Sequence, residues 1–160
     1  GQTDMGAARP AQLQEEGIPT QPEDLRNHNC LLYRGDSGEQ RWYYRTSLKD
    51  KYKNIEVRGG ISSNNAGALV AAAQDGAGIV LFPTWIFSPE IFLNGSLIRL
   101  LPDWDMSAES VPTFIHALYP ENNLRSHRTR EILKFLVDEI GSPPYWDQYF
   151  MNNHYSLGNV

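Results

Sequence analysis

The sequence predicts an α/β fold in which helices cover a parallel sheet. Between residues 66 and 73, apolar residues recur at i, i+3, i+4 and i+7, the spacing of one helix face. The apolar run at residues 79–82 (IVLF), which Pro83 ends, is typical of a strand buried on both faces. Residues 61–64 (ISSN) indicate the end of another strand just before the helix. A strand, a helix and a strand in this order form the crossover unit of a parallel sheet.

Local patterns predict the elements that precede this unit. Pro10 opens a short helix that ends by Gly17, and Pro22 with its acidic neighbours opens a second one. Residues 1–8 show no periodicity, so no element is predicted there. Strands are expected at residues 28–33, 42–45 and 55–59, with a turn at 35–38.

The part of the chain after Pro83 ends in a long amphipathic helix. Proline and glycine delimit the segments before it: a short helix at 88–95, strands at 97–101 and 113–119, and a polar loop at 102–112. Ser126 is expected to cap the long helix and Gly141 to end it, and its apolar stripe consists of Ile132, Leu133, Leu136, Val137 and Ile140. The tail after it is rich in aromatic residues, so it is expected to pack onto another part of the protein as far as about Phe150.

Composition narrows the class of protein. The 160 residues suffice for one domain with a real core, and 41% of them are hydrophobic and 21% charged. No apolar run approaches the roughly 20 residues that span a bilayer, and no signal-peptide pattern is visible, so a cytoplasmic setting is expected. The single cysteine excludes an internal disulfide, and a net charge of −5 disfavours binding of nucleic acid by this chain alone.

The sequence offers little for catalysis, for metal binding or for a cofactor. It contains no nucleophile elbow, zinc-binding HExxH, phosphate-binding loop or dinucleotide fingerprint, and its four histidines lack metal-ligand spacing. Cys30 beside His28 could form a reactive pair, but two residues at i and i+2 of a strand lack the geometry of an activated nucleophile. We therefore expect Cys30 to be a buried small hydrophobe and expect neither an enzyme nor a cofactor.

Two other clusters have both a functional and a structural interpretation. The aromatic residues at 42–44 could stack on a ring-shaped ligand, but an aromatic sheet face in the core is favoured. The basic cluster of Arg125, His127, Arg128 and Arg130 could touch DNA phosphates, but a solvated helix face is favoured in an acidic chain.

Ligand binding is better supported, at the corner that precedes the central helix. Ser63 or Asn64 can accept a hydrogen bond from the first-turn backbone N–H groups, and such a helix start also attracts a carboxylate or another anion. Capping and ligand binding both remain open for these two residues. Pro83 and Thr84 follow the buried strand at its carboxyl end, where ligands of parallel sheets bind, so they should face the same crevice. Tyr33 ends another strand, and Arg34 beside it could supply a cation.

Several ordered motifs give the chain a family resemblance. The run SSNNAGALVAAAQDGAGIVLFPTWIFSPEIFLNGSLIRLLPDW at residues 62–104 resembles the effector-binding domain of LysR-type transcriptional regulators. Its glycine–isoleucine–proline pattern at 76–83 and its closing G-x-L-x-x-L-L-P-x-W at 95–104 fit that family. The segments PAQLQEEGIPTQPEDLRNHNCLLY at 10–33 and SHRTREILKFL at 126–136 fit as well, so the resemblance extends over residues 9–141.

The resemblance implies one half of a two-lobed domain. Domains of this family have a type 2 periplasmic-binding-protein-like fold, with a mixed, mainly parallel sheet flanked by helices in each lobe. Residues 1–112 would form the second lobe, and residues 113–160 the segment returning to the first lobe plus the tail. The DNA-binding helix-turn-helix domain and the opening of lobe one are not recognisable in this chain. We therefore expect the apolar stripe of the last helix to be covered by another chain, a swapped segment or the aromatic tail.

The resemblance also implies a function. The chain would sense a small-molecule effector for a transcriptional regulator that is a homo-oligomer and binds DNA only through its helix-turn-helix domain. Ser63, Asn64 and Thr84, with Pro83 and Tyr33, are carried over as effector-binding residues. A solute-binding protein of a transporter has the same two-lobed fold and is the alternative. An enzyme on this scaffold is a third interpretation, disfavoured by the missing catalytic motifs.

Overall fold

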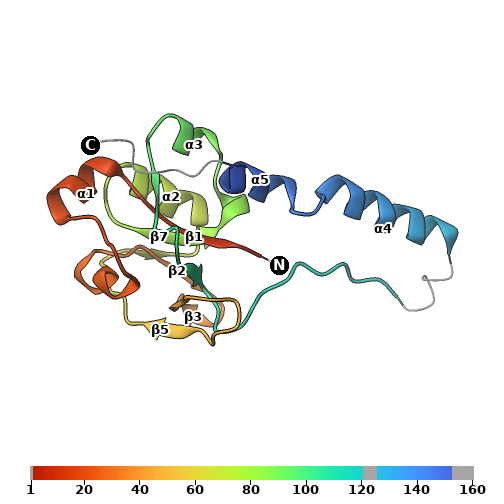
Figure 1. The fold of residues 1–160 in the computed structure, drawn as a ribbon, viewed down its shortest axis with the longest axis horizontal. Coiled ribbons are helices and arrows are strands. Elements are labelled where there is room, and N and C mark those ends of the chain that lie inside the picture. The colour runs from red at the N-terminus through yellow and green to blue at the C-terminus, as the bar shows by residue number, and fades with distance from the viewer. Residues whose placement is uncertain (1, 121–125, 153–160) are drawn as a thin grey trace.

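The computed structural model describes residues 2–120 and 126–152, and Figure 1 shows their arrangement. A rounded body holds the sheets and most helices, while a long helix and an extended segment project from one side of it. The elements in chain order are β1 (Asp4–Ala8), α1 (Pro10–Glu16), the 3-10 helix η1 (Pro22–Asn27), β2 (Leu32–Gly35), β3 (Gly38–Glu39), β4 (Trp42–Arg45), β5 (Lys53–Ile55), β6 (Ser62–Ser63), α2 (Ala66–Gln74), β7 (Val80–Pro83), the 3-10 helix η2 (Thr84–Ile86), α3 (Glu90–Leu93), β8 (Ile98–Leu100), β9 (Asp105–Ser107), α4 (His127–Ile140) and α5 (Tyr145–Asn152).

The predicted crossover through α2 is confirmed. Residues 29–31 run parallel to the start of β7, where the Leu31 N–H donates to the Ile79 carbonyl at 2.8 Å and the Ile79 N–H donates to the Asn29 carbonyl at 2.9 Å. The same segment continues into β2, which pairs in parallel with β6. The strands before and after α2 therefore run in the same direction, with residues 29–33 between them.

The α/β class with a mixed sheet is confirmed, but antiparallel pairs outnumber parallel ones. β1 lies between β7 and β8 and is antiparallel to both. β4 lies between β5 and β9 and is again antiparallel to both, and β2 forms a hairpin with β3. The prediction of a mainly parallel sheet is wrong in this detail, because two strands that the sequence does not reveal, β1 and β9, add antiparallel pairs.

The strand β1 was not predicted, although all five of its residues are buried. Its sequence DMGAA has neither alternation nor β-branched residues, because small side chains pack on both of its faces. Met5 and Ala7 lie in one hydrophobic cluster and Ala8 in another. Tertiary packing, rather than local propensity, makes this segment a strand.

Three further predictions of strands differ from the structure. Residues 102–112 were predicted to be a polar loop, but they contain β9. This segment becomes a strand because it pairs in antiparallel with Tyr43–Arg45 of β4. β5 ends at Ile55, and in the segment after it Arg58 forms only an isolated parallel bridge to Asn29. Residues 113–119 belong to no sheet, since no strand among the described residues pairs with them; the Gln2 N–H donates to the Thr113 carbonyl at 2.8 Å, just before β1. The other predicted helices and strands are confirmed to within a few residues of their bounds.

Two hydrophobic clusters pack on opposite faces of the sheet β7-β1-β8. Consecutive residues such as Val80 and Leu81 belong to different clusters, as expected of a strand whose side chains alternate between faces. One cluster includes Leu69, Val70 and Ala73 of α2, so the predicted apolar stripe of this helix is buried. The packing fixes α2 and the strand ends beside it in place.

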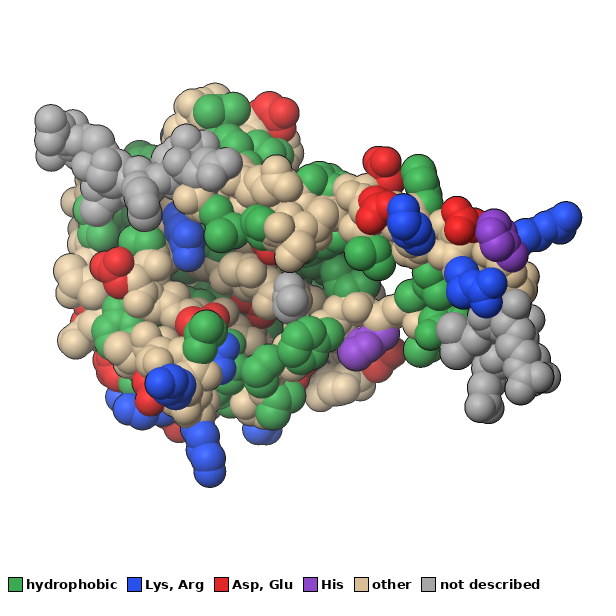
Figure 2. Space-filling model, turned by 45° about the vertical axis from the view of Figure 1, so that its right-hand side comes forward, with side chains coloured by type: hydrophobic (Ala, Val, Ile, Leu, Met, Phe, Trp, Pro, Cys, Tyr) green, Lys and Arg blue, Asp and Glu red, His purple; other side chains and the backbone are tan. Residues whose placement is uncertain are grey.

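The amphipathic helix α4 is the exception to this packing. It forms where it is predicted, but within the described residues it buries none of its side chains. Figure 2 shows it standing away from the body with charged side chains on its outer side. The described part of the aromatic tail does not cover it, because α5 packs on the body instead and buries Phe150 there. Tyr155, the last aromatic residue of the tail, lies outside the described residues. Of the three expected covers, only another chain or a swapped segment remains as a prediction.

Candidate functional site

The parallel pair β2 and β6 creates a hollow at its carboxyl end. Leu32 lies opposite Ser62 and Tyr33 opposite Ser63, so both strands end at the same edge of the sheet. Beyond that edge lies an open hollow of about 650 Å³. Its lining consists of Tyr33, Arg34, Gly35, Asp36, Ser62, Ser63 and Asn64. Three of the five predicted effector-binding residues therefore share one hollow, at the position where ligands of such sheets bind.

The start of α2 is capped one residue later than predicted. The Asn65 side chain accepts a hydrogen bond from the Ala68 N–H at 3.0 Å. Ser63 contributes indirectly, since its hydroxyl oxygen accepts from the Asn65 N–H at 3.1 Å. The prediction that Ser63 or Asn64 caps the helix is therefore wrong, because Asn65 is the last residue with extended backbone before α2. Asn64 lies exposed in the hollow, and its amide is not used in the cap.

An aromatic ring and a cation form the opposite wall of the hollow. The Tyr33 ring is half-buried and meets Phe82 edge to face, with 6.1 Å between ring centroids. Arg34 is exposed, and its guanidinium lies 3.5 Å from a carboxylate oxygen of Glu39. Such an exposed ion pair is weak, so the guanidinium can exchange Glu39 for a bound anion at little cost. The sequence pointed to Tyr33 and Arg34, but Asp36 was recognised only as part of a turn.

Pro83 and Thr84 do not line this hollow. They follow β7 at its carboxyl end, as predicted, but the Thr84 side chain is buried, with 2% of its surface exposed. Its hydroxyl donates a hydrogen bond to the carboxylate of Asp147 in α5. Nothing in the spacing of the sequence indicates this contact, which joins residues 63 positions apart.

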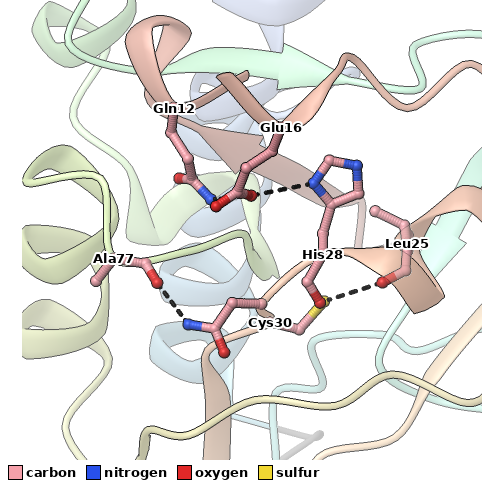
Figure 3. A network of polar contacts seen from close by, with 7 residues as sticks. Gln12, Glu16, Leu25, His28, Cys30 and Ala77 are labelled. Carbon is pink, nitrogen blue, oxygen red and sulfur yellow. Dashed lines mark hydrogen bonds and ion pairs between the residues drawn. The ribbon is translucent and has the colours of Figure 1, made fainter. Parts of the chain in front are cut away.

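The pair His28 and Cys30 is not arranged as a nucleophile and its base. Figure 3 shows that the two side chains reach different partners. The Cys30 thiol donates to the Leu25 carbonyl at 3.8 Å, whereas His28 Nδ1 lies 3.4 Å from a carboxylate oxygen of Glu16. Burial raises the pKa of the Cys30 thiol to about 12, so the reactive thiolate is scarce at neutral pH. The interpretation of Cys30 as a buried small hydrophobe is confirmed.

The aromatic residues at 42–44 and the basic cluster at 125–130 were the two groups with both a functional and a structural interpretation. Trp42 and Tyr44 are buried in the hydrophobic core, which confirms the core interpretation for these rings. His127, Arg128 and Arg130 lie on the exposed first turn of α4, and the fourth member of that cluster, Arg125, lies outside the described residues. The His127 ring lies 3.8 Å from Glu131 on the next turn of the helix, an exposed pair of the kind that solvated helix faces carry.

Neither a metal centre nor a membrane span is visible in the part of the chain that the structure describes. Among residues 2–120 and 126–152, no three His, Cys, Asp or Glu side chains gather as metal ligands would. None of the described helices combines the length and the apolar character needed to cross a bilayer. The hollow beside α2 is therefore the candidate site that we consider further.

Comparison with known proteins assigns the chain to a family. The family described as LysR substrate binding domain matches residues 3–141. The chain belongs to the LysR substrate-binding domain family. Membership of this family agrees with the α/β fold seen here, and the family comprises regulatory binding domains rather than enzymes.

Relatives and solved structures of LysR regulators give the extent of the similarity. An HTH-type transcriptional regulator of Haemophilus influenzae is 32% identical over 114 residues, which are 71% of this chain and 37% of that protein. The HTH-type transcriptional activator TtdR of Escherichia coli K12 is 30% identical over 85% of this chain and 43% of its own length. The regulatory domain of AphB from Vibrio vulnificus is 30% identical and superimposes with a TM-score of 0.55, covering 64% of this chain and 50% of that domain.

These comparisons bear on the competing interpretations. The chain spans less than half the length of each of these two curated relatives. Both relatives are named as transcriptional regulators, which favours the regulator over the solute-binding protein of a transporter.

Proposed function

We propose that this chain is the effector-sensing part of a LysR-type transcriptional regulator. A small molecule would bind in the hollow at the ends of β2 and β6 and alter how the full-length protein binds DNA. The observation that carries the proposal is the convergence of Tyr33, Ser63 and Asn64 on one hollow beside the start of a helix. Family membership supports the same conclusion.

The chemistry of the hollow favours an effector that carries an anionic group. Asn64 offers an exposed amide, and Arg34 offers a guanidinium that is paired only with an exposed carboxylate. The first turn of α2 adds the positive end of a helix dipole on the same side. Tyr33 supplies an apolar ring against which the carbon skeleton of a small acid can pack.

Pro83 and Thr84 remain predictions as effector-binding residues. Pro83 directly follows Phe82, which contacts the Tyr33 ring, so it lies near the wall of the hollow. The Thr84 hydroxyl is occupied by Asp147, so it can reach an effector only when that carboxylate moves away. A role for Thr84 is thus conditional on a change in the position of α5.

The domain organisation and the partners are part of the same proposal. Residues 1–112 would form the second lobe of the effector-binding domain, and residues 113–160 would be the segment that returns to the first lobe plus the C-terminal tail. The exposed apolar stripe of α4 supports this division, because such a stripe normally packs against another element. The intact regulator would be a cytoplasmic homo-oligomer that contacts DNA through a helix-turn-helix domain outside these residues.

The test is a binding experiment with the full-length regulator. Thermal shift with a panel of small mono-, di- and aromatic carboxylates identifies a ligand, whose affinity is then measured by calorimetry. Asn64→Ala should weaken binding by about tenfold, the equivalent of one lost hydrogen bond. Asn94→Ala, which removes an exposed asparagine outside the hollow, is the matched control. If the affinity is the same in Asn64→Ala, Thr84→Ala and the unchanged protein, the hollow is not the effector site.

A further inference from the structure

A buried carboxylate joins the C-terminal helix α5 to the body of the protein. Asp147, in the first turn of α5, is 6% exposed, and one of its oxygens accepts the hydrogen bond from the Thr84 hydroxyl. The other oxygen lies 3.5 Å from the Thr3 hydroxyl, which donates to it. Burial of a carboxylate is costly unless its oxygens are hydrogen-bonded, so these two hydroxyls fix where α5 can dock.

A row of aromatic rings leads from α5 to the hollow. Phe150 of α5 is buried and meets Phe92 of α3 edge to face, with 5.3 Å between centroids. Phe92 meets Phe87 at 5.5 Å, and Phe87 meets Phe82 of β7 at 6.3 Å. Phe82 in turn meets Tyr33, which lines the hollow. The docking surface of α5 and the wall of the candidate site therefore share the strand β7 and the residues that follow it.

The position of α4 depends on α5. Among the described residues, α4 buries no side chain of its own against the body. It is followed by residues 141–144 and then directly by α5, which does pack on the body. Whatever holds or releases α5 therefore also sets the direction in which the apolar stripe of α4 faces.

We propose that α5 is a latch that couples the hollow to the position of α4. In the closed latch, Asp147 occupies the hydroxyls of Thr84 and Thr3, and Phe150 completes the aromatic row. Displacement of the residues at the end of β7 weakens both contacts and frees the α4–α5 pair to move. The latch itself is independent of the proposed function, whereas its control by an effector rests on that function. By linkage, release of the latch must in turn change the hollow.

Hydrogen exchange measured by mass spectrometry on the ligand-free 160-residue chain tests the latch. Asp147→Asn preserves the shape of the side chain but removes its charge and one acceptor oxygen. Loss of these charge-assisted hydrogen bonds should speed amide exchange in residues 145–152 by about tenfold or more. The matched control is Asp138→Asn, which makes the same change at an exposed carboxylate of α4. Equal exchange of α5 in both variants would overturn the latch.

The coupling has its own readout in the same experiment. In Asp147→Asn, the segments at 80–87 and 31–35 should also exchange faster, whereas the control should leave them unchanged. Faster exchange confined to α5 would overturn the coupling. Thr84→Ser keeps the hydroxyl and should restore the slow exchange that Thr84→Val loses; equal exchange in these two would also overturn the latch. If Thr84→Val does not fold, as judged by circular dichroism, Phe150→Leu takes its place and should release α5 as Asp147→Asn does.

Because no ligand is involved, this experiment can fail while Asn64→Ala still weakens effector binding. The reverse outcome is equally possible. The latch and the proposed function are therefore tested separately.

Discussion

Helices α2 and α4 carry the same kind of apolar stripe, yet only α2 is packed. α2 buries Leu69, Val70 and Ala73 against the sheet, whereas in α4 Leu136 is 43% exposed and no side chain of the stripe is buried. Burying a Val, Leu or Ile side chain contributes about 1.5–3 kcal/mol, so the three exposed stripe residues Ile132, Leu136 and Val137 together forgo about 4–9 kcal/mol. An amphipathic pattern therefore specifies that a helix needs a partner, but it does not specify where that partner comes from.

The two helices also differ at their first residues. Asn65 caps α2 with a side-chain hydrogen bond, whereas Ser126 makes no such bond at the start of α4. The capped start of α2 lies at the hollow, and the uncapped start of α4 lies at the far end of the projecting arm (Figure 1). The helix start with a side-chain cap is thus the one beside the proposed ligand site.

The largest expected effect comes from shortening one side chain in each stripe. Leu69→Ala should lower the free energy of unfolding by about 2–5 kcal/mol, because it leaves a cavity in a closed core. Leu136→Ala should change the free energy of unfolding by less than about 0.5 kcal/mol, because the Leu136 side chain is exposed and its removal leaves no cavity. Urea denaturation of the 160-residue chain measures both. A large loss for Leu136→Ala would mean that α4 is packed in solution, for instance against a second copy.

A smaller loss of stability is expected from a substitution at Gly59, which precedes β6 and lies against the backbone of Cys30. A β-carbon added at Gly59 would overlap the carbonyl oxygen of Cys30, whereas one added at Gly60 would meet only open space. Gly59→Ala should therefore force the two segments apart and cost about 1–3 kcal/mol, as overpacking does. Gly60→Ala is the control, and equal stability of the two variants in urea would contradict the close approach.

The caps give a third and still smaller contrast. Asn65→Ala should lower the free energy of unfolding by about 1 kcal/mol, the usual contribution of an N-cap. Ser126→Ala should change it by less than about 0.5 kcal/mol, because no cap bond is lost. Thermal unfolding followed by circular dichroism distinguishes them. Equal losses would show that Ser126 does cap α4 in solution.

The smallest expected effect concerns how the free energy of unfolding depends on pH through Asp4. This residue contacts Ala108, which lies shortly before the extended segment that projects from the body together with α4. Asp4 of β1 accepts a hydrogen bond from the Ala108 N–H at 2.8 Å, and burial raises the pKa of Asp4 above its ordinary value of 3.8. At pH values between these two pKa values, the Asp4 carboxyl is protonated in the folded state and ionised in the unfolded chain. This contribution to stability therefore falls as the pH rises from the unfolded pKa through the higher folded one.

The variant Asp4→Asn isolates this effect. The free energy of unfolding of the unchanged protein, minus that of Asp4→Asn, should decrease between about pH 3.5 and pH 7. Denaturant titrations at several pH values in this range give the difference. A difference that rises with pH would contradict the direction of the Asp4 pKa shift.

The elements predicted correctly are those with a complete local pattern. Residues 66–74 and 80–83 carry periodicity, a polar start and a glycine or proline at the end, so α2 and β7 could be predicted. Asp4–Ala8 could not, because its burial comes from β7 and β8, which are distant in the sequence. Residues 113–119 have the composition of a strand, but a strand also needs a neighbour, and composition does not reveal whether one is present.

The candidate site could be predicted only in part, for the same reason. Tyr33, Ser63 and Asn64 converge because parallel strands end at one edge, a rule that spacing alone can apply. The burial of Thr84 depends on Asp147, whose position is set by the docking of α5 on the body. A contact of that range has no local sequence pattern, so only coordinates could show it.

The burial of the lone thiol has a practical consequence. Cys30 is the only cysteine of the chain, it is fully buried, and its raised pKa leaves little thiolate to react. A cysteine introduced on the exposed surface of the arm would therefore be the one thiol that maleimide or nitroxide reagents modify. Fluorescent or spin labels can then report the movement of the arm without replacing any native residue of the core.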